Sequence, residues 1–255
     1  MTTVSIRVDA HGADAARPPL VLGPSLGTVS AQVWEDAEAR LAARFTLVHW
    51  DLPGHGTAPA SDSPFTVADL ADALAAALPG PVAYAGVSLG GAVGLELARR
   101  HPHLVASLAV VCSAAAFGEP QAWEDRAAQV RSTGTAALVT GAASRWFAPE
   151  TIGRRPDLVG RLLHGLRDAD DASYARCCEA LARFDAREHL GEVEAPTLAL
   201  WGDLDPVTPE ACAAEVAHGV RRGRAQGIAG ASHLAPVDAP QAVADALITH
   251  LEGHP

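Results

Sequence analysis

A serine between two glycines, in Gly86-Val87-Ser88-Leu89-Gly90, is the clearest chemical feature of this sequence. The G-x-S-x-G pattern lies directly between an apolar run that predicts a strand, residues 81–86, and a pattern that predicts a helix, residues 90–100. On such a sharp turn a serine hydroxyl is exposed, and small neighbours let strand and helix approach closely. The helix N-terminus also favours developing negative charge. We therefore predict that Ser88 is a nucleophile.

A second match to the pattern, Gly23-Pro24-Ser25-Leu26-Gly27, also follows a predicted strand. The residues after it are not the tiny ones that tight strand–helix packing needs, so we favour Ser88 over Ser25. This loop fits an oxyanion hole better, because there backbone N–H groups bind the negative oxygen of a reacting ester. The N–H of Leu26 would pair with that of Leu89, the residue after the nucleophile. Ser25 is also a candidate substrate-binding residue.

Two carboxylates, Asp203 and Asp205, follow a predicted strand at residues 197–201. Asp205 lies beyond the tip of this strand. We expect Thr208 after it to cap a helix whose first residue is Pro209. Asp203 is interpreted as a turn former, which makes Asp205 the predicted acid.

His233, in the loop after the last predicted strand at residues 224–228, is the predicted base. It completes the chain order Ser, Asp, His, and in such a triad the histidine takes the proton of the serine during acyl transfer. His49 and His55 bracket Asp51, but their spacing matches no standard metal site. We therefore expect a structural role for His55, and neither a metal nor a cofactor.

Composition excludes several other chemistries. The chain has 255 residues and a net charge of −11, and all 19 basic residues are arginine. The absence of lysine removes Schiff-base chemistry, a Ser-Lys dyad and a P-loop, and the absence of asparagine removes a Cys-His-Asn triad. An acidic chain without a basic run is not expected to bind nucleic acid or an anionic membrane. No apolar run approaches the roughly 18 residues of a membrane span.

Four cysteines, at positions 112, 177, 178 and 212, include no C-x-x-C pair. The neighbours Cys177 and Cys178 are poorly placed to bond to each other. Reduced cysteines and a start without the pattern of a signal peptide lead us to expect a cytoplasmic protein.

Short apolar runs alternate with helical patterns over most of the chain, which is typical of an α/β fold with a mostly parallel sheet. The predicted strands are residues 4–8, 19–22, 45–50, 81–86, 104–112, 197–201 and 224–228, and the predicted helices are 31–43, 66–78, 90–100, 209–217 and 240–251.

The alternation of strand and helix patterns stops between residues 117 and 189. This stretch predicts helices and lacks β-branched runs. This stretch holds 10 arginines and 11 acidic residues, so it is nearly neutral within an acidic protein. We predict a helical cap over 117–189, inserted into a core domain formed by 1–116 and 190–255.

These features together resemble the α/β-hydrolase superfamily over the whole length of the chain. The turn at 51–56, the turn at 86–91, Asp205 and His233 occur in the order of that superfamily. The likeness extends to the 3-oxoadipate enol-lactonases, for example in the cap segment Tyr174-Ala175-x-Cys177-Cys178. Its most specific features are Arg145-Trp146-Phe147 and the pair Cys177-Cys178, which general esterases do not share. Pro24 and residues 235–238 depart from the family pattern.

The resemblance implies an α/β-hydrolase fold with a helical cap at the carboxyl ends of the strands, and hydrolysis of 3-oxoadipate enol-lactone in bacterial degradation of aromatic compounds. Such a substrate is a small anionic lactone, so a local cation must offset the acidity of the protein. Without lysine, that cation is an arginine or a protonated histidine. Arg145 beside Trp146, and Arg126 one helical turn after Trp123, are the candidate substrate-binding residues.

Other functions remain as alternatives. The same fold carries carboxylesterases, C–C bond hydrolases and cofactor-free haloperoxidases, and fold alone does not separate them. A non-catalytic ligand receptor would be expected to lack part of the triad, whereas all three positions are filled here. A dinucleotide site is disfavoured because Gly90-Gly91 does not extend to G-x-G-x-x-G. The sequence leaves open whether the chain forms a homo-oligomer.

Overall fold

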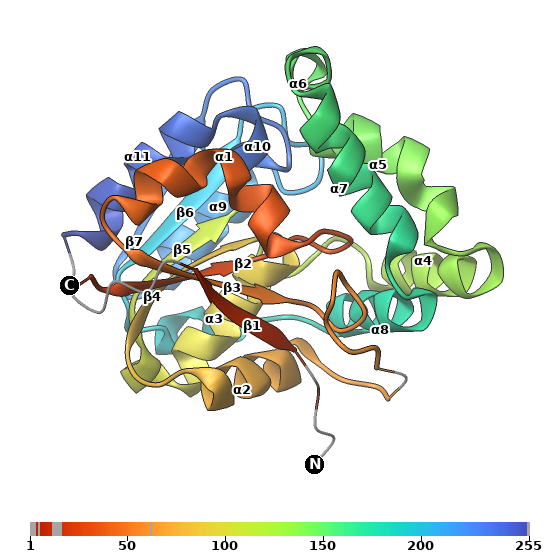
Figure 1. Ribbon diagram of the computed structural model, residues 1–255. Helices are drawn as coiled ribbons and strands as arrows, with labels where there is room; N and C mark the ends of the chain where they lie inside the picture. The colour runs from red at the N-terminus through yellow and green to blue at the C-terminus, as the bar shows by residue number, and fades with distance from the viewer. Residues whose placement is uncertain (1–3, 5, 12–16, 62, 254–255) are drawn as a thin grey trace.

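A seven-stranded sheet forms the centre of the protein in a computed structural model that describes residues 4, 6–11, 17–61 and 63–253 (Figure 1). The strand order is β1-β3-β2-β4-β5-β6-β7. Only β1 runs antiparallel to its neighbour in this sheet. The strands are β1 (Arg7–His11), β2 (Pro19–Gly23), β3 (Thr46–Asp51), β4 (Val82–Val87), β5 (Val105–Val111), β6 (Thr197–Gly202) and β7 (Gly223–Ile228).

The central strands are mostly apolar because helices cover both faces of the sheet. Every residue of β4 is buried. Gly23 at the end of β2 pairs with Gly86, and Val87 pairs with Val111 at the end of β5. The carboxyl ends of β2, β4 and β5 therefore meet at one edge, and this edge supports the loop after Gly23 and the turn that carries Ser88.

Helices α1 and α11 pack together on one side of the sheet, and α2 and α3 pack together on the other (Figure 1). Helix α2 begins with a capping box in which the Thr66 hydroxyl accepts from the Asp69 N–H at 3.1 Å and the Asp69 carboxylate accepts from the Thr66 N–H at 2.8 Å. The core helices are α1 (Ser30–Ala42), α2 (Val67–Ala77), α3 (Leu89–Arg100), α9 (Glu210–Gly219), α10 (Ala235–Asp238) and α11 (Pro240–Leu251).

Five further helices follow one another between β5 and β6 and gather at one side of the sheet (Figure 1). Helices α4 and α8 make the most extensive contact among them. This helical run lies within the expected interval 117–189, and its treatment as a separate cap domain stays a prediction. The helices are α4 (Pro120–Thr133), α5 (Val139–Trp146), α6 (Pro149–Arg154), α7 (Pro156–Asp168) and α8 (Asp171–Ala182).

Two local predictions were wrong, and one short element was missed. The first strand begins at Arg7 rather than at Val4, because pairing with β3 defines the extent of this edge strand, and alternation in the sequence does not reveal where the partner strand ends. Helix α9 begins at Glu210 with Pro209 as its N-cap, because the Thr208 hydroxyl bonds to another partner. The short helix α10 was not predicted. Most other expected boundaries lie within about two residues of those observed.

Residues 1–3, which bear on the signal-peptide prediction, lie outside the described residues, as does Ser5 of the expected first strand. Among the helices that the structure describes, none is both long and apolar enough to cross a membrane.

Candidate active site

Ser88 occupies a strained turn between β4 and α3. Its backbone has φ 55° and ψ −118°, a conformation that L-residues rarely adopt. Hydrogen bonds hold both sides of the residue: its N–H donates to the Val111 carbonyl at 2.9 Å, and its carbonyl accepts from the Ser113 hydroxyl at 2.7 Å. The surrounding structure thus stabilises a backbone that would otherwise relax.

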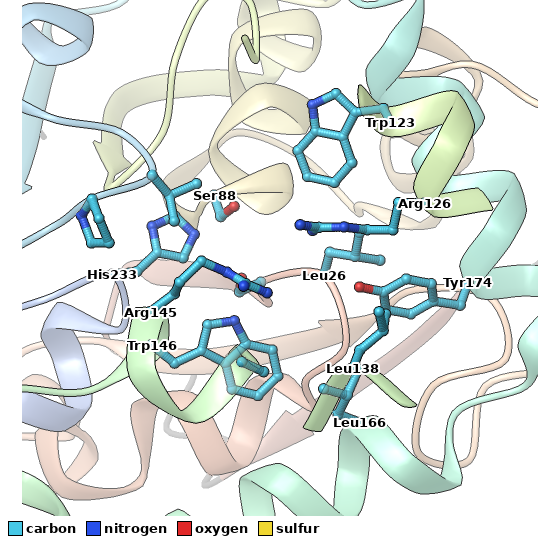
Figure 2. Close-up of a pocket in the computed structure, with 14 residues that line it drawn as sticks. Leu26, Ser88, Trp123, Arg126, Leu138, Arg145, Trp146, Leu166, Tyr174 and His233 are labelled. Carbon is cyan, nitrogen blue, oxygen red and sulfur yellow. The ribbon is translucent and has the colours of Figure 1, made fainter. Parts of the chain in front are cut away.

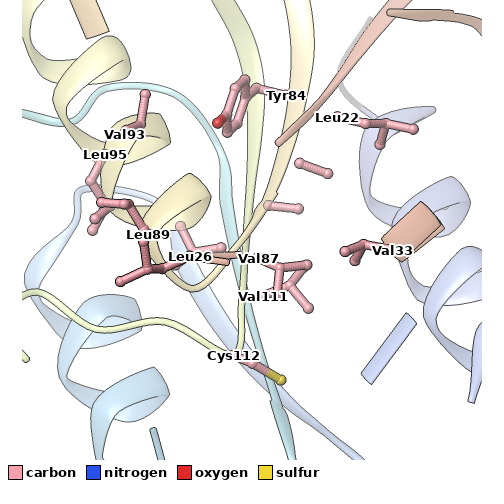
Figure 3. Close-up of a cluster of buried hydrophobic side chains, with 14 of the residues drawn as sticks. Leu22, Leu26, Val33, Tyr84, Val87, Leu89, Val93, Leu95, Val111 and Cys112 are labelled. Carbon is pink, nitrogen blue, oxygen red and sulfur yellow. The ribbon is translucent and has the colours of Figure 1, made fainter. Parts of the chain in front are cut away.

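Two glycines of the turn are required by close backbone contacts. A Cβ on Gly86 would lie 2.3 Å from the Gly90 carbonyl oxygen, and a Cβ on Gly90 would lie 2.4 Å from that of Pro24. Beneath the turn the buried Tyr84 hydroxyl donates to the Gly90 carbonyl at 2.7 Å. Figure 3 shows Leu26 and Leu89 among the apolar side chains that surround this region. Dense packing therefore fixes the position of the serine.

The loop after β2 lies directly against this turn. The Gly90 N–H donates to the Pro24 carbonyl at 3.0 Å, and within the loop the Ser25 N–H donates to the Thr28 hydroxyl at 3.0 Å. The Gly27 N–H donates to Nε2 of His55 at 3.1 Å. The N–H groups of Ser25 and Gly27, the two neighbours of Leu26, are therefore already hydrogen-bonded within the protein. Leu89 is the first residue of α3, where an N–H has no acceptor within its own helix.

Asp205 and His233 are hydrogen-bonded. Oδ2 of Asp205 lies 2.9 Å from Nδ1 of His233, and both side chains are buried. Oδ2 also accepts from the Thr208 hydroxyl at 2.7 Å, and Oδ1 accepts from the Val207 N–H at 2.8 Å. Burial alone would raise the pKa of Asp205, but the contacts with His233 and these donors hold it below its usual value. The carboxylate is therefore ionised over the neutral pH range.

Asp203 is placed differently. It is exposed, and its carboxylate accepts from the Gly230 N–H at 2.7 Å. The structure thus brings Asp205 to the histidine, while Asp203 ties two surface loops together.

A cavity of about 240 Å³ lies beside Ser88 and His233 (Figure 2). The five residues expected to bind substrate, Ser25, Trp123, Arg126, Arg145 and Trp146, all line it. Of the two residues expected to form the oxyanion hole, Leu26 lines the cavity, whereas Leu89 is not among its lining residues. Six further residues line it that sequence reasoning did not single out as site residues, namely Leu138, Ala142, Leu166, Tyr174, Pro206 and Val207. The polar group among these six is the Tyr174 hydroxyl, which Figure 2 shows near Arg126.

Tyr174 lies in the cap segment that resembles the enol-lactonases, and that segment was the signal that could have identified it. The cysteines of the same segment do not line this cavity; Cys177 and Cys178 are fully buried on the packed side of α8. Burial raises the pKa of both thiols, to about 12 for Cys178. Their role is consistent with packing. The inward-facing leucines carried no signal, because their direction depends on how the cap helices pack.

Arg126 and Arg145 concentrate positive charge in the cavity. The Arg126 guanidinium stacks over Trp123 at 4.7 Å from the ring centroid, and Figure 2 shows both guanidinium groups directed into the cavity. Burial lowers the pKa of Arg145, and the charge of Arg126 lowers it further. Within the described part of the chain neither arginine forms an ion pair with a carboxylate. Other cap arginines do so: Arg131 and Arg176 pair with Glu179, Arg155 with Asp36, Arg161 with Glu35, Arg167 with Asp168 and Arg187 with Asp185.

The two histidines around Asp51 have separate partners. His49 contacts the Ser30 hydroxyl at 3.0 Å and Glu38 at 3.2 Å. Nδ1 of His55 donates to the Pro53 carbonyl at 2.8 Å, while its Nε2 accepts from the loop after β2. Burial outweighs the hydrogen bond to Pro53 and lowers the pKa of His55 to about 4, so this ring is neutral at neutral pH.

The chain belongs to the alpha/beta hydrolase family, which matches residues 10–246. This confirms the expected fold class. Among its relatives, 3-oxoadipate enol-lactonase 2 of Acinetobacter baylyi is 33% identical over 232 residues, which cover 89% of this chain and 86% of that protein. A crystal structure of the enol-lactonase from Burkholderia xenovorans superposes with a TM-score of 0.91 at 27% identity and covers 98% of this chain and 99% of that one.

Esterases are also among the relatives. A pimeloyl-[acyl-carrier protein] methyl ester esterase of Neisseria meningitidis is 34% identical over 187 residues, which cover 69% of this chain and 72% of that protein. The chain is thus an alpha/beta hydrolase homologous both to enol-lactonases and to methyl ester esterases.

Proposed function

We propose that this protein hydrolyses the lactone ester of 3-oxoadipate enol-lactone to 3-oxoadipate, in bacterial degradation of aromatic compounds. The observation that carries the proposal is the pair of arginines without carboxylate partners in the cavity that also contains Ser88 and His233. A neutral ester would leave two partly desolvated cations uncompensated, whereas a substrate with a free carboxylate would neutralise them. Similarity to enol-lactonases points to the same substrate class.

In the proposed reaction His233 removes the hydroxyl proton of Ser88, whose oxygen attacks the lactone carbonyl. Asp205 holds Nδ1 of the ring, which leaves Nε2 to take this proton, and it stabilises the imidazolium that forms. The N–H groups of Leu26 and Leu89 bind the negative oxygen of the tetrahedral intermediate. Collapse of that intermediate breaks the ring C–O bond and releases an enolate oxygen. The enolate takes up a proton as His233 gives up the one that it removed from Ser88, and becomes a ketone, so its departure needs little acid catalysis.

The ring oxygen of a lactone stays attached to the acyl chain, so the acyl-enzyme carries the whole product. His233 then removes a proton from water, which attacks the acyl carbonyl and regenerates Ser88.

We assign the substrate carboxylate to Arg145 and Arg126. Trp123 and Trp146 form walls beside these cations, and Ser25 lines the cavity close to Leu26. A planar guanidinium can bind both oxygens of a carboxylate, which orients the substrate as well as retaining it.

The test is a spectrophotometric assay with freshly generated enol-lactone, compared with p-nitrophenyl acetate. We expect a kcat/KM at least about 100-fold higher for the lactone, equal to about 2.7 kcal/mol of additional transition-state stabilisation. A clear preference for the neutral ester would instead indicate a carboxylesterase, which the similarity to pimeloyl ester esterases makes the second candidate.

A further inference from the structure

The segment that carries the cavity arginine and the loop that carries the base are bonded to each other. The Leu234 N–H donates to the Trp146 carbonyl at 2.8 Å, and the Ser232 hydroxyl donates to the Arg145 carbonyl at 2.9 Å. Ser232 and Leu234 are the two neighbours of His233. The backbone on both sides of the base is therefore tied to the backbone of two residues that line the cavity.

A buried carboxylate, that of Asp238, completes this connection. It accepts from the Ala148 N–H at 3.0 Å and from the Ser232 N–H at 2.7 Å. The Asp238 backbone carbonyl accepts from Arg154 at 2.6 Å. The side chain is 5% exposed, and burial raises its pKa although the bonds from Thr151 and the two backbone N–H groups oppose this. Asp238 thus bonds to both segments at once.

We infer that Asp238 is a positioning residue that holds the base His233 and the substrate-binding Arg145 in a fixed relative placement. A carboxylate suits this task because both of its oxygens accept, and backbone N–H groups from two segments converge on it. Both N–H groups bond to Oδ2, and the Ala148 N–H also reaches Oδ1 at 3.1 Å. An asparagine with its amide oxygen in the Oδ2 position would therefore place an amide donor where Oδ1 now accepts from Ala148. The role of Arg145 rests on the proposed function, whereas the placement of His233 does not.

This connection has a consequence for kinetics. Loss of the Asp238 carboxylate should displace His233 and Arg145 together, because the loop of His233 and the segment of Arg145 are held in place by their bonds to each other. Displacement of a catalytic group by about 1 Å can cost up to about 100-fold in rate. A residue that only stabilised the fold would lower the melting temperature and leave the kinetic constants of the folded fraction unchanged.

The experiment compares Asp238→Asn with Asp51→Asn, a control that removes another buried carboxylate. Asp51 is 8% exposed and accepts from the Ser30 N–H at 2.7 Å, outside the cavity. For Asp238→Asn we expect kcat on p-nitrophenyl acetate to fall about 10-fold or more and KM for the enol-lactone to rise about 5-fold. Asp238→Glu, which keeps the charge, should partly restore both the kcat on p-nitrophenyl acetate and the KM for the enol-lactone. Asp51→Asn should lower the melting temperature but leave kcat on p-nitrophenyl acetate and KM for the enol-lactone unchanged.

A milder variant covers the case in which Asp238→Asn does not fold. Ser232→Ala removes the bond to the Arg145 carbonyl and should raise KM for the lactone more than it lowers kcat on the neutral ester. Wild-type constants in Ser232→Ala, or in a folded Asp238→Asn with only a lowered melting temperature, would overturn the inference. Because p-nitrophenyl acetate carries no carboxylate, its kcat tests the placement of His233 even if Arg145→Ala shows that the anionic substrate was misassigned.

Discussion

Asp205 and His233 are 28 residues apart in the sequence, and their side chains meet at 2.9 Å between Oδ2 and Nδ1. The contact is buried, so the carboxylate stays close to the ring without competition from water. It leaves Nε2 of the ring as the nitrogen that can accept a proton in the cavity lined by Ser88. This pair is the acid–base half of the proposed triad, and three of the four predictions below depend on it or on the cavity beside it.

The nucleophile can be tested by comparing two serines of the same cavity. Ser88→Ala should abolish nearly all hydrolysis, because no other group at the turn can form the acyl-enzyme, while the fold persists. Ser25→Ala should keep much of the activity, since Ser25 contributes its loop backbone to the site. Kinetics on p-nitrophenyl acetate, with circular dichroism to check folding, distinguish the two. An active Ser88→Ala beside a dead Ser25→Ala would reverse the assignment.

The acid is tested by Asp205→Asn. An amide would present a donor to Nδ1 of His233 and favour the wrong tautomer, so we expect kcat to fall by about 10⁴, the scale known for neutralising a triad acid. Asp203→Asn is the matched control, because this exposed carboxylate also accepts a backbone N–H but does not contact the histidine. A larger loss for Asp203→Asn than for Asp205→Asn would contradict the proposed triad.

Recognition of the substrate charge is tested by Arg145→Ala. We expect KM for the anionic enol-lactone to rise about 10-fold or more, a loss of about 1.4 kcal/mol. Arg126→Ala should act in the same direction, because its guanidinium lines the same cavity. Turnover of a neutral ester should hardly change, since Arg145→Ala leaves the residues of the proposed triad in place. Equal losses on both substrates would point to a misfolded cap, and Arg167→Ala, which removes an exposed cap arginine, is the control.

His55 makes stability depend on pH. Its pKa in the folded protein is about 4, below the ordinary 6.5, because the ring is buried. As the pH falls from 6.5 towards 4 the unfolded chain binds a proton that the folded chain does not, so stability falls, by on the order of 3 kcal/mol in full. Above pH 6.5 both states are neutral and this histidine has no effect.

Denaturant unfolding at pH 7.5 and pH 5 measures this dependence. In His55→Gln, where the amide oxygen can still accept the Gly27 N–H, the pH dependence should be smaller than in the wild type. The difference between the two proteins isolates His55 from Asp205, whose lowered pKa places its own loss of stability below about pH 4. The same pH dependence in both proteins would show that His55 is not the group responsible.

Local patterns explain why much of the fold could be predicted. Apolar runs of strand length specified seven strands, and glycines that no larger residue can replace specified the turn at Ser88. Asp205 and His233 were predicted from their places after two strands, because the carboxyl ends of parallel strands meet at one edge of a sheet. The strands and the turn at Ser88 depend on residues close in the sequence, and the placement of Asp205 and His233 depends on the parallel arrangement of the strands that they follow.

Other parts of the site depend on contacts that local patterns do not record. Thr208 was expected to cap a helix, but its hydroxyl bonds to Asp205 once the loop folds. Asp238 looked like a departure from a family pattern, and only its bonds to the distant Ala148 and the nearby Ser232 reveal what it connects.

The sequence by itself determined the strands of the sheet, the strained turn at Ser88 and the order of the proposed triad, because backbone conformation, small side chains and periodicity act over short distances. The tertiary structure alone decided that Arg126 and Arg145 face one cavity while other arginines, such as Arg131 and Arg161, form ion pairs with carboxylates. It also decided that Tyr174 lines that cavity while Cys177 packs behind it. The physical reason is that the direction of a side chain on a cap helix depends on how that helix packs against segments distant in the chain.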